Sequence, residues 1–365
     1  MSQTSDAEKK RAQLEEKILN ALRTVKDPDL HKDIVALKFV KDLKVDNGKA
    51  SFTIELTTPA CPVKKEMEQW AREAVAKVDG ISSVEIRMTS AVSARSPRGE
   101  KKPIEGVKNI IAVGSGKGGV GKTTVTVNLA VALAQSGAKV GLMDADIYGP
   151  NVPLMMGTME RPRAGNNRIQ PVSHHGVSIM SMGFLMSDDT AVIWRGPMLH
   201  SAVQQFVRDV DWGELDYLLV DLPPGTGDVQ LTLTQTVPLM GAVVVSTPQD
   251  VALQDARKAI KMFRQVKVDI LGIVENMSYF QCPHCSQRTN IFGRGGGEAT
   301  ASRYQTPFLG EIPLDVTIRE GGDTGKPIVL HDPNAPAAKA FSEIAGRVAA
   351  QVSVSNLNTL SDRIT

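Results

Sequence analysis

GSGKGGVGKTT, residues 114–124, is the stretch that decides the fold. It follows a short apolar run at 109–113 and precedes a helical pattern. The stretch contains the spacing GxxxxGK[ST], which is typical of phosphate-binding loops when it lies between a strand and a helix. Its glycines let backbone N–H groups converge on phosphate oxygens at the N-terminus of that helix. The sequence therefore predicts a nucleotide-binding loop in an α/β domain.

Two side chains of this loop carry its chemistry. Lys122 offers a positive charge to the β- and γ-phosphates, and the hydroxyl of Thr123 is a ligand for Mg²⁺. We therefore expect a bound nucleotide together with Mg²⁺. The residues expected to bind this nucleotide are Gly116, Lys117, Gly118, Gly119, Val120, Gly121, Lys122, Thr123 and Thr124.

Short apolar runs, rich in β-branched residues, alternate with helical segments along the rest of this region. Unbroken apolar strands between helices are typical of a parallel sheet that is covered on both faces. The sequence therefore predicts an α/β fold, a doubly wound and mostly parallel sheet, over residues 107–365. The expected strands are 109–113, 139–143, 217–222, 242–247, 271–275 and 307–310.

A smaller α+β domain is expected at the N-terminus, over residues 1–90. Its strongest local signal is Asp46-Asn47-Gly48 between two alternating runs, because Asn and Gly both tolerate the positive φ of a hairpin turn. Residues 91–106 are polar, basic and contain proline and glycine, which is typical of a flexible linker. The expected elements of the small domain are helices at 6–25 and 62–78 and strands at 34–45, 50–57 and 83–88.

Composition and charge exclude several classes of protein. Of the 365 residues, 42% are hydrophobic and 22% are charged, which is ordinary for globular domains and excludes a wholly disordered chain. The formal net charge of +2 gives no field that would favour nucleic acid as the main partner. No apolar run approaches the roughly 18 residues that span a bilayer, and the N-terminus lacks the apolar stretch of a signal peptide. We expect a cytoplasmic protein with neither a membrane nor a nucleic-acid partner.

Carboxylates follow two of the expected strands. Asp144 and Asp146 come after the strand at 139–143, and Asp221 lies near the end of another. The carboxyl ends of parallel strands border the crevice in which α/β sheets bind ligands. Asp144 and Asp146 are candidates for holding the waters of Mg²⁺ or orienting an attacking water, and capping the following turn is the alternative for each. Asp221 is the expected Walker B carboxylate, and 225–228 the expected switch loop.

One Cys-x-x-Cys motif, Cys282-Pro283-His284-Cys285, lies beyond the strand at 271–275. Three cysteines are too few for a disulfide framework, so metal or redox chemistry is the better interpretation. Two thiolates do not fill the four ligand positions of zinc or of a [4Fe–4S] cluster, whereas a symmetric dimer would supply four. A transferable cluster, a structural zinc, a redox dithiol and an inert pair all remain open, with His284 as a spacer.

Lys117 is an extra lysine that the common phosphate loop does not require. KGGVGKT resembles the deviant Walker A signature of ATPases that include nitrogenase iron protein and the Min and Par positioning ATPases. The resemblance implies that Lys117 reaches across a dimer interface to ATP on the partner chain, that Asp146 positions the attacking water, and that Asn276 reads adenine. The residues with implied catalytic roles are Lys117, Lys122, Asp146 and Asp221, and Asp144 and Asn276 join the cofactor-binding set.

Six motifs together resemble the Mrp/ApbC family of iron–sulfur cluster carrier ATPases. They are GKGGVGKTT at 116–124, DADIYGPN at 144–151, WRGPM at 194–198, VDLPPGTGD at 220–228, ENMS at 275–278 and CPHC at 282–285. The N-terminal unit, with DPDL at 27–30 and TTPACP at 57–62, resembles a SufT/PaaD-type domain. Asn151 departs from the serine that the family commonly has after Gly-Pro.

This resemblance implies a function. The protein would bind and hydrolyse ATP with Mg²⁺ as a homodimer, and would hold a labile [4Fe–4S] cluster on Cys282 and Cys285 of each subunit. It would then pass the cluster to apoprotein clients, with assembly scaffold proteins as further partners.

Two other functions fit the phosphate loop. A Min- or Par-like positioning ATPase, with a structural zinc or an inert CPHC, acts on membrane or DNA, yet the C-terminal stretch offers neither a basic amphipathic helix nor a basic patch. A regulatory tyrosine kinase on the same scaffold would end in a tyrosine cluster, and no tyrosine follows Tyr304.

Cys61, in the N-terminal domain, precedes an expected helix start at Pro62. A helix N-terminus lowers the pKa of a nearby thiol, so we expect a lowered pKa here. A role in cluster handling and an inert buried side chain are both open for Cys61.

Overall fold

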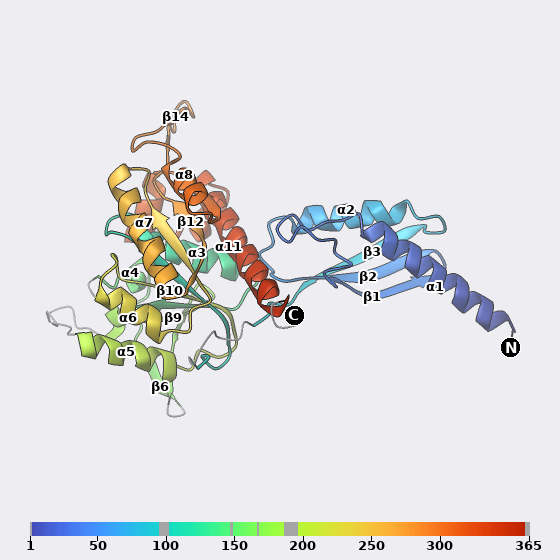
Figure 1. The fold of residues 1–365 in the computed structure, drawn as a ribbon, viewed down its shortest axis with the longest axis horizontal. Coiled ribbons are helices and arrows are strands. Elements are labelled where there is room, and N and C mark those ends of the chain that lie inside the picture. Colours follow the sequence, from blue (N-terminus) through green and yellow to red (C-terminus); the bar gives the residue numbers. More distant parts are fainter. Residues whose placement is uncertain (1, 95–101, 147–148, 166–167, 186–195, 362–365) are drawn as a thin grey trace. The chain divides into compact units, whose positions relative to one another are not determined.

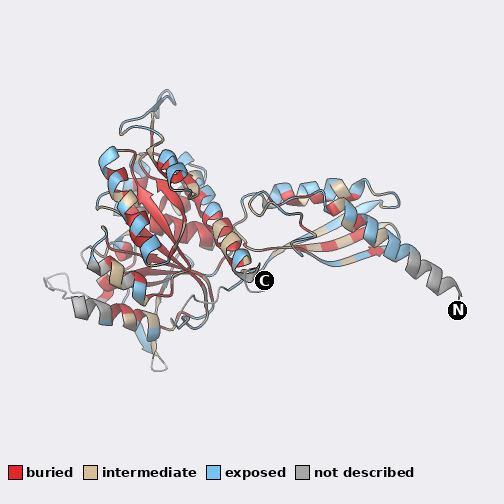
Figure 2. Cartoon of the chain, in the orientation of Figure 1, coloured by how far each residue is buried: buried red, intermediate tan, exposed pale blue. Residues whose placement is uncertain are grey.

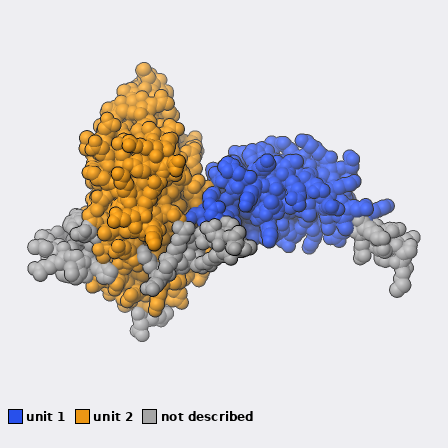
Figure 3. Space-filling model, viewed as in Figure 1, with its two compact units in different colours: residues 1–93, 353–365 blue, residues 94–352 orange. Residues whose placement is uncertain are grey.

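The structure, a computed structural model, describes residues 2–94, 102–146, 149–165, 168–185 and 196–361. The chain forms two compact units, one of residues 1–93 with 353–365 and one of residues 94–352 (Figure 3). We expected residues 353–365 to belong to the ATPase domain, whereas in the structure they group with residues 1–93. The domain limits themselves stay a prediction. Part of the expected linker, at 95–101, and Trp194 and Arg195 of the WRGPM motif lie outside the described residues.

The first unit is a three-stranded sheet with two helices on one face (Figure 1). β1 and β2 are antiparallel, whereas β2 and β3 are parallel. Ala50, Phe52, Ile54 and Leu56 of β2 are buried because alternate residues of a strand point to the same face. The elements of this unit are α1 (Ser2–Leu22), β1 (Val40–Asp46), β2 (Lys49–Leu56), α2 (Lys64–Ala76) and β3 (Ser83–Ser90).

The expected hairpin is present, but its first strand is shorter than expected. The turn lies at Asn47 and Gly48, with φ of 47° and 79°, as the Asn-Gly signal predicts. The strand expected from residue 34 begins only at Val40. The reason is local, because the Asp33 carboxylate accepts hydrogen bonds from the backbone N–H groups of residues 35 and 36 and forms a turn there.

The second unit is built on an eight-stranded sheet with the strand order β15-β12-β11-β4-β10-β5-β9-β8. Every neighbouring pair is parallel except β8 and β9. The expected α/β fold with a mostly parallel sheet is therefore confirmed. The strands are β4 (Val107–Ser115), β5 (Val140–Asp144), β8 (Val172–His174), β9 (Val177–Ser181), β10 (Leu215–Asp221), β11 (Gly241–Ser246), β12 (Asp269–Glu275) and β15 (Phe308–Glu311).

Helices cover both faces of this sheet (Figure 1). They are α3 (Lys122–Gln135), α4 (Val152–Met156), α5 (Gly196–Arg208), α6 (Asp228–Thr236), α7 (Asp250–Gln265), α8 (Gly296–Arg303), α9 (Val316–Asp323), α10 (Ile328–His331) and α11 (Pro336–Ser361), with a 3₁₀ turn at Met182–Leu185. Two short hairpins complete the unit, β6 (Arg163–Gly165) with β7 (Arg168–Gln170) and β13 (Phe280–Gln281) with β14 (Arg288–Thr289).

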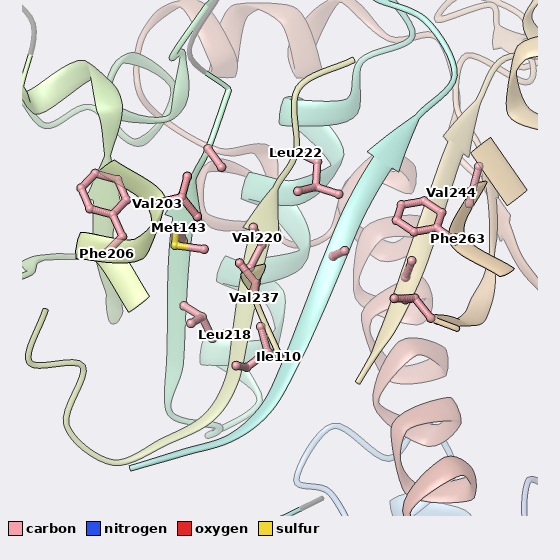
Figure 4. Packing of buried hydrophobic residues seen from close by; sticks show 14 of the residues in the cluster. Ile110, Met143, Val203, Phe206, Leu218, Val220, Leu222, Val237, Val244 and Phe263 are labelled. Atoms are coloured by element: carbon pink, nitrogen blue, oxygen red, sulfur yellow. The ribbon is translucent and has the colours of Figure 1, made fainter. Parts of the chain in front are cut away.

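The core of this unit lies on either side of the central strands β4 and β10, which are buried almost throughout (Figure 2). On one face, Ile110 and Val220 pack with Phe206 of α5 and Phe263 of α7 (Figure 4). Since successive strand residues point to opposite faces, the intervening residues pack on the other side, where α3 contacts β4, β5 and β10. This packing fixes the sheet edge from which the site is built.

The edge pair β8–β9 was missed by the sequence patterns. β8 has only three residues, and the connecting turn uses His175 and Gly176 at φ of 50° and 75°. Such a short antiparallel edge gives no apolar run that can be told from a loop. No helix among the described residues combines the length and apolar character needed to cross a membrane.

Substitution of Phe263 tests the packing beneath the phosphate loop. A methyl group added at Gly114 would lie 2.9 Å from the Phe263 ring, so the ring directly supports the end of β4. We expect Phe263→Ala to lower the free energy of unfolding by about 3–5 kcal/mol, measured by urea denaturation. Met159→Ala, at a side chain that is 68% exposed, is the control and should change it by less than about 0.5 kcal/mol. Equal effects of the two substitutions would contradict this packing.

Candidate functional site

The phosphate loop joins the end of β4 to the start of α3, as the sequence predicts. Gly119 and Gly121 have φ of 78° and 79°, a backbone region that favours glycine. A Cβ atom at Gly116 would lie 2.0 Å from the carbonyl carbon of Asp255, and one at Gly121 would lie 2.2 Å from Nδ2 of Asn276. The loop therefore packs so closely against α7 and Asn276 that a side chain at either glycine would displace it.

A buried lysine lies at the centre of the site. Nζ of Lys122 lies 2.6 Å from Oδ2 of Asp221 and 3.5 Å from Oδ2 of Asp146. The hydroxyl of Thr123 donates to the same Asp221 oxygen at 2.7 Å, and that of Thr126 donates to the other oxygen at 2.7 Å. The structure thus brings Lys122, Thr123, Asp146 and Asp221 together. These four residues come from three segments, which are the start of α3, the segment after β5 and the end of β10.

Asp144 lies beside this group and is fully buried at the end of β5. Its Oδ2 accepts hydrogen bonds from Oγ of Ser181 at 2.7 Å and from the N–H of Val152 at 3.3 Å, and its Oδ1 accepts one from the N–H of Asp146 at 3.1 Å. Burial, together with the negative charge of Asp221, raises the pKa of Asp144 to about 7. The carboxyl group is therefore held in place from several sides.

Ser181 was not among the expected site residues. It ends β9, and its hydroxyl also accepts a hydrogen bond from the N–H of Gly183 at 2.9 Å. A buried serine at the carboxyl end of a strand next to β5 was the available signal, but β9 itself had not been recognised.

Lys117 lies within the loop, whereas Thr124 belongs to the first turn of α3. Lys117 is partly exposed, and its carbonyl oxygen accepts a hydrogen bond from the Ser115 hydroxyl at 2.9 Å. Within the described ranges its ammonium group has no ion pair. Thr124 instead lines a pocket of about 220 Å³ next to the loop.

This pocket also contacts Asn276, which follows β12. Nδ2 of Asn276 donates to the carbonyl oxygen of Val120 at 2.9 Å. A carbonyl oxygen only accepts, so this contact fixes the amide and directs its Oδ1 elsewhere as an acceptor. Met155, Leu314 and Ile318 contribute apolar surface to the same pocket.

The expected switch loop follows β10 and touches the phosphate loop. The N–H of Gly225 donates to the carbonyl oxygen of Ser115 at 3.0 Å, and Gly225 has a φ of 101°. The side chain of Asp228 lies outside the described part of the chain. A backbone link therefore connects the two loops that a nucleotide would contact.

The CPHC motif forms the turn of the β13–β14 hairpin. Cys282 is partly exposed and Cys285 is exposed, and the N–H of Ser286 donates to the Cys282 carbonyl at 2.8 Å. Hydrogen bonds from the backbone of Cys285 and His284 to the sulfur lower the pKa of the Cys282 thiol. Across the described residues, no group of three or more His, Cys, Asp or Glu side chains is arranged to hold a metal ion. The described part of one chain thus offers two thiols at an accessible tip and no complete metal site.

The expected lowering of the Cys61 pKa is wrong. Burial, with smaller contributions from the nearby carboxylates of Asp27 and Asp29, raises the pKa of this thiol to about 11. The helix also begins later than expected, at Lys64 with Val63 as its N-cap, so the thiol does not occupy the N-cap position. An unreactive thiol is the interpretation that this environment favours.

The buried carboxyl group of Asp144 predicts a pH-dependent stability. Because the pKa of Asp144 is raised, the folded chain binds the carboxyl proton more tightly than the unfolded chain. The free energy of unfolding therefore decreases as the pH rises from about 4 through about 7. Asp144→Asn mimics the neutral form. We expect it to raise the melting temperature of the nucleotide-free protein at pH 8 and to change it little at pH 5. The exposed Asp209→Asn is the control, and a gain that does not grow with pH would contradict the assignment.

Comparisons with known proteins agree over both parts of the chain. A family model described as "NUBPL iron-transfer P-loop NTPase" matches residues 106–349, and one described as "Iron-sulfur cluster assembly protein" matches residues 15–88. The iron-sulfur cluster carrier protein of Synechocystis is 49% identical over 346 residues, covering 93% of this chain and 98% of that protein. The mouse iron-sulfur cluster transfer protein NUBPL is 50% identical over 265 residues, covering 72% and 82%.

Solved structures show the same fold. A nucleotide-binding protein of Archaeoglobus fulgidus in complex with ADP has a TM-score of 0.57 and 41% identity, covering 65% of this chain and 92% of that chain. The cell division ATPase MinD of Pyrococcus furiosus has a TM-score of 0.50 and 27% identity, covering 66% and 98%. With its paired lysines, its buried carboxylates and these matches, the chain belongs to the NUBPL family of iron-transfer P-loop NTPases.

Proposed function

We propose that this protein is an ATP-dependent carrier of iron–sulfur clusters. Two copies of the chain hold one labile [4Fe–4S] cluster, as cargo, between Cys282 and Cys285 of each subunit and pass it from assembly scaffolds to apoproteins. The observation that carries the proposal is the accessible thiol pair at the tip of the β13–β14 hairpin, in the same compact unit as the phosphate loop. Its relatives from Synechocystis and mouse, named for carrying or transferring clusters, support it.

The residues of the phosphate loop suit ATP and Mg²⁺. The loop has no room for a Cβ atom at Gly116 or Gly121. A loop of glycines at the start of a helix lets backbone N–H groups bind phosphate oxygens. Hydroxyl and carboxylate oxygens are the ligands that Mg²⁺ prefers, and Thr123 and Asp221 offer both within 2.7 Å of each other. Mg²⁺, when bound, neutralises charge on the phosphates.

Each charged group near the loop has a proposed task in hydrolysis. Lys122 binds the β- and γ-phosphates, which replace Asp221 as its anionic partner. Asp221 with Thr123 then holds the metal, and Asp146 orients the attacking water. Asp144, fixed by its three hydrogen bonds, keeps the backbone around Asp146 in place.

The 220 Å³ pocket beside the loop suits an adenine base. Because Nδ2 of Asn276 donates to Val120, its Oδ1 remains to accept a hydrogen bond, and we propose that this oxygen faces the six-position of the base. Adenine presents an amino group at its six-position, whereas guanine presents an oxygen. Asn276 thus favours ATP over GTP.

Lys117 is the residue proposed to link ATP to dimerisation. It lies in the loop but is only partly buried and has no carboxylate partner among the described residues. A flexible, unpaired ammonium at this place is suited to reach the phosphates bound by a second copy. The dimer in turn brings together the four thiolates that a [4Fe–4S] cluster needs.

The two loop lysines should fail in different ways. We expect Lys122→Ala to reduce ATP hydrolysis by at least about a hundredfold, because it removes the charge that binds the phosphates. Lys117→Ala should abolish the rise in mass that ATP induces, measured by light scattering, because it removes the contact between copies. Lys258→Ala, at an exposed lysine paired with Asp255, is the matched control for both. An unchanged ATP-induced mass for Lys117→Ala would contradict the shared site.

Loss of the thiol pair should remove the cargo alone. After anaerobic reconstitution with iron and sulfide, native mass spectrometry should find a dimer with one four-iron, four-sulfide increment. Cys282→Ala/Cys285→Ala should lack this increment and retain nucleotide binding, whereas Cys61→Ala should retain the cluster. Zinc in place of the cluster would instead indicate a structural metal and overturn the carrier function.

A further inference from the structure

A groove of about 450 Å³ lies at the foot of the hairpin that carries the two thiols. Residues of β15 and α11 form its walls, and α8 and the base of the β13–β14 hairpin also contribute to its lining. Tyr279 and Arg288 contribute from the hairpin, with the guanidinium 4.0 Å from the centre of the tyrosine ring. Figure 1 shows the hairpin, labelled β14, projecting beyond α8. The nucleotide site uses none of these residues.

The wall formed by β15 is a sheet edge. β15 is the outermost strand of the eight, paired only with β12 within the described residues. The outer side of such a strand presents N–H and C=O groups that an added extended chain can pair with. One carbonyl oxygen of β15, that of Leu309, already accepts a hydrogen bond from the guanidinium of Arg347 at 2.9 Å.

The wall formed by α11 carries charges of alternating sign. Lys339, Glu343 and Arg347 are exposed, lie four residues apart in sequence and all line the groove. This spacing favours ion pairs along a helix. Nevertheless the described residues show no ion pair of Lys339, Glu343 or Arg347, within α11 or beyond it. Within the described part of the chain, Lys339, Glu343 and Arg347 therefore face the groove without an ionic partner, and the guanidinium of Arg347 has further N–H donors beyond the one bound to Leu309.

The spacing of these charges matches an extended chain. Residues four apart on a helix are about 6 Å apart along its axis, and alternate residues of a strand are about 6.6 Å apart. We propose that this groove binds an extended segment of a cluster-accepting protein, in which an acidic, a basic and a second acidic residue alternate with apolar ones. The segment would add to the edge of β15 and place its charges opposite Lys339, Glu343 and Arg347. Acid, base, acid reads the same in both directions, so either strand direction fits.

The groove lies near the two cysteines, so a bound segment would bring the acceptor close to the cluster. This part of the inference rests on the carrier function proposed above. Cys282 follows Tyr279 by three residues and Cys285 precedes Arg288 by three residues. Three residues of extended chain span about 10 Å, so a segment that contacts the stacked pair of Tyr279 and Arg288 lies about that far along the chain from each cysteine. Docking here would hold the acceptor's own ligands near the cargo.

Binding of two synthetic peptides tests the groove directly. Fluorescein-labelled Gly-Glu-Val-Lys-Val-Glu-Gly and its charge-inverted partner Gly-Lys-Val-Glu-Val-Lys-Gly are titrated with the full chain at low salt, without nucleotide or cluster, and followed by fluorescence anisotropy. We expect the first peptide to bind about tenfold more tightly, since reversing three exposed pairs changes three small contributions of the same sign. Lys339→Glu/Glu343→Lys should reverse this preference, because it inverts two of the three helix charges.

A matched charge swap controls for general electrostatics. Lys139→Glu/Glu214→Lys changes the same residue types at exposed positions away from the groove and should leave the preference as in the wild type. Equal binding of both peptides by the wild type, or a preference that survives Lys339→Glu/Glu343→Lys, overturns the proposal. So does self-association of the nucleotide-free wild type that this variant abolishes, read by light scattering, because the occupant would then be a second copy. None of these results depends on bound iron, so failure of the groove and failure of the carrier function are separate outcomes.

Discussion

A buried ammonium group sets the terms for the rest of this structure. Lys122 is only 6% exposed, and a charge removed from water in this way requires a partner of opposite sign. Asp221, at the end of β10, and Asp146, in the segment after β5, supply the negative charge. β5 and β10 are neighbouring strands of the sheet. The strand order β5-β10-β4 is what brings the lysine and both carboxylates to one edge. A bound anion would therefore interact with a lysine that already has two carboxylate partners.

Much of this arrangement could be predicted from the sequence, because its signals are local. The glycine pattern of the loop, the apolar runs that end in Asp144 and Asp221, and the Asn-Gly hairpin each depend on a few neighbouring residues. Parallel strands then force the aspartates to the same edge whatever the remaining packing. The pairing of Lys122 with Asp221, 99 residues apart, follows from that topology.

What sequence patterns could not predict depends on burial and on distant contacts. Ser181 was missed because β9 lies near an antiparallel edge and its role arises only from a neighbour 37 residues away. Cys61 was misjudged because its environment, which includes Asp27, comes from packing of the small domain and not from the adjacent helix. The orientation of the Asn276 amide could not be predicted either, because it depends on the carbonyl oxygen of Val120, 156 residues earlier in the sequence.

The contrast between the cysteines has a practical consequence for spectroscopy. The Cys61 thiol, with its pKa near 11, carries almost no thiolate at neutral pH, whereas Cys282 has a lowered pKa at an accessible turn. Alkylating dyes and spin labels react with thiolates, so they will attach to the hairpin of the otherwise unaltered chain. A reporter group can thus be placed at the tip of the β13–β14 hairpin without replacing Cys61.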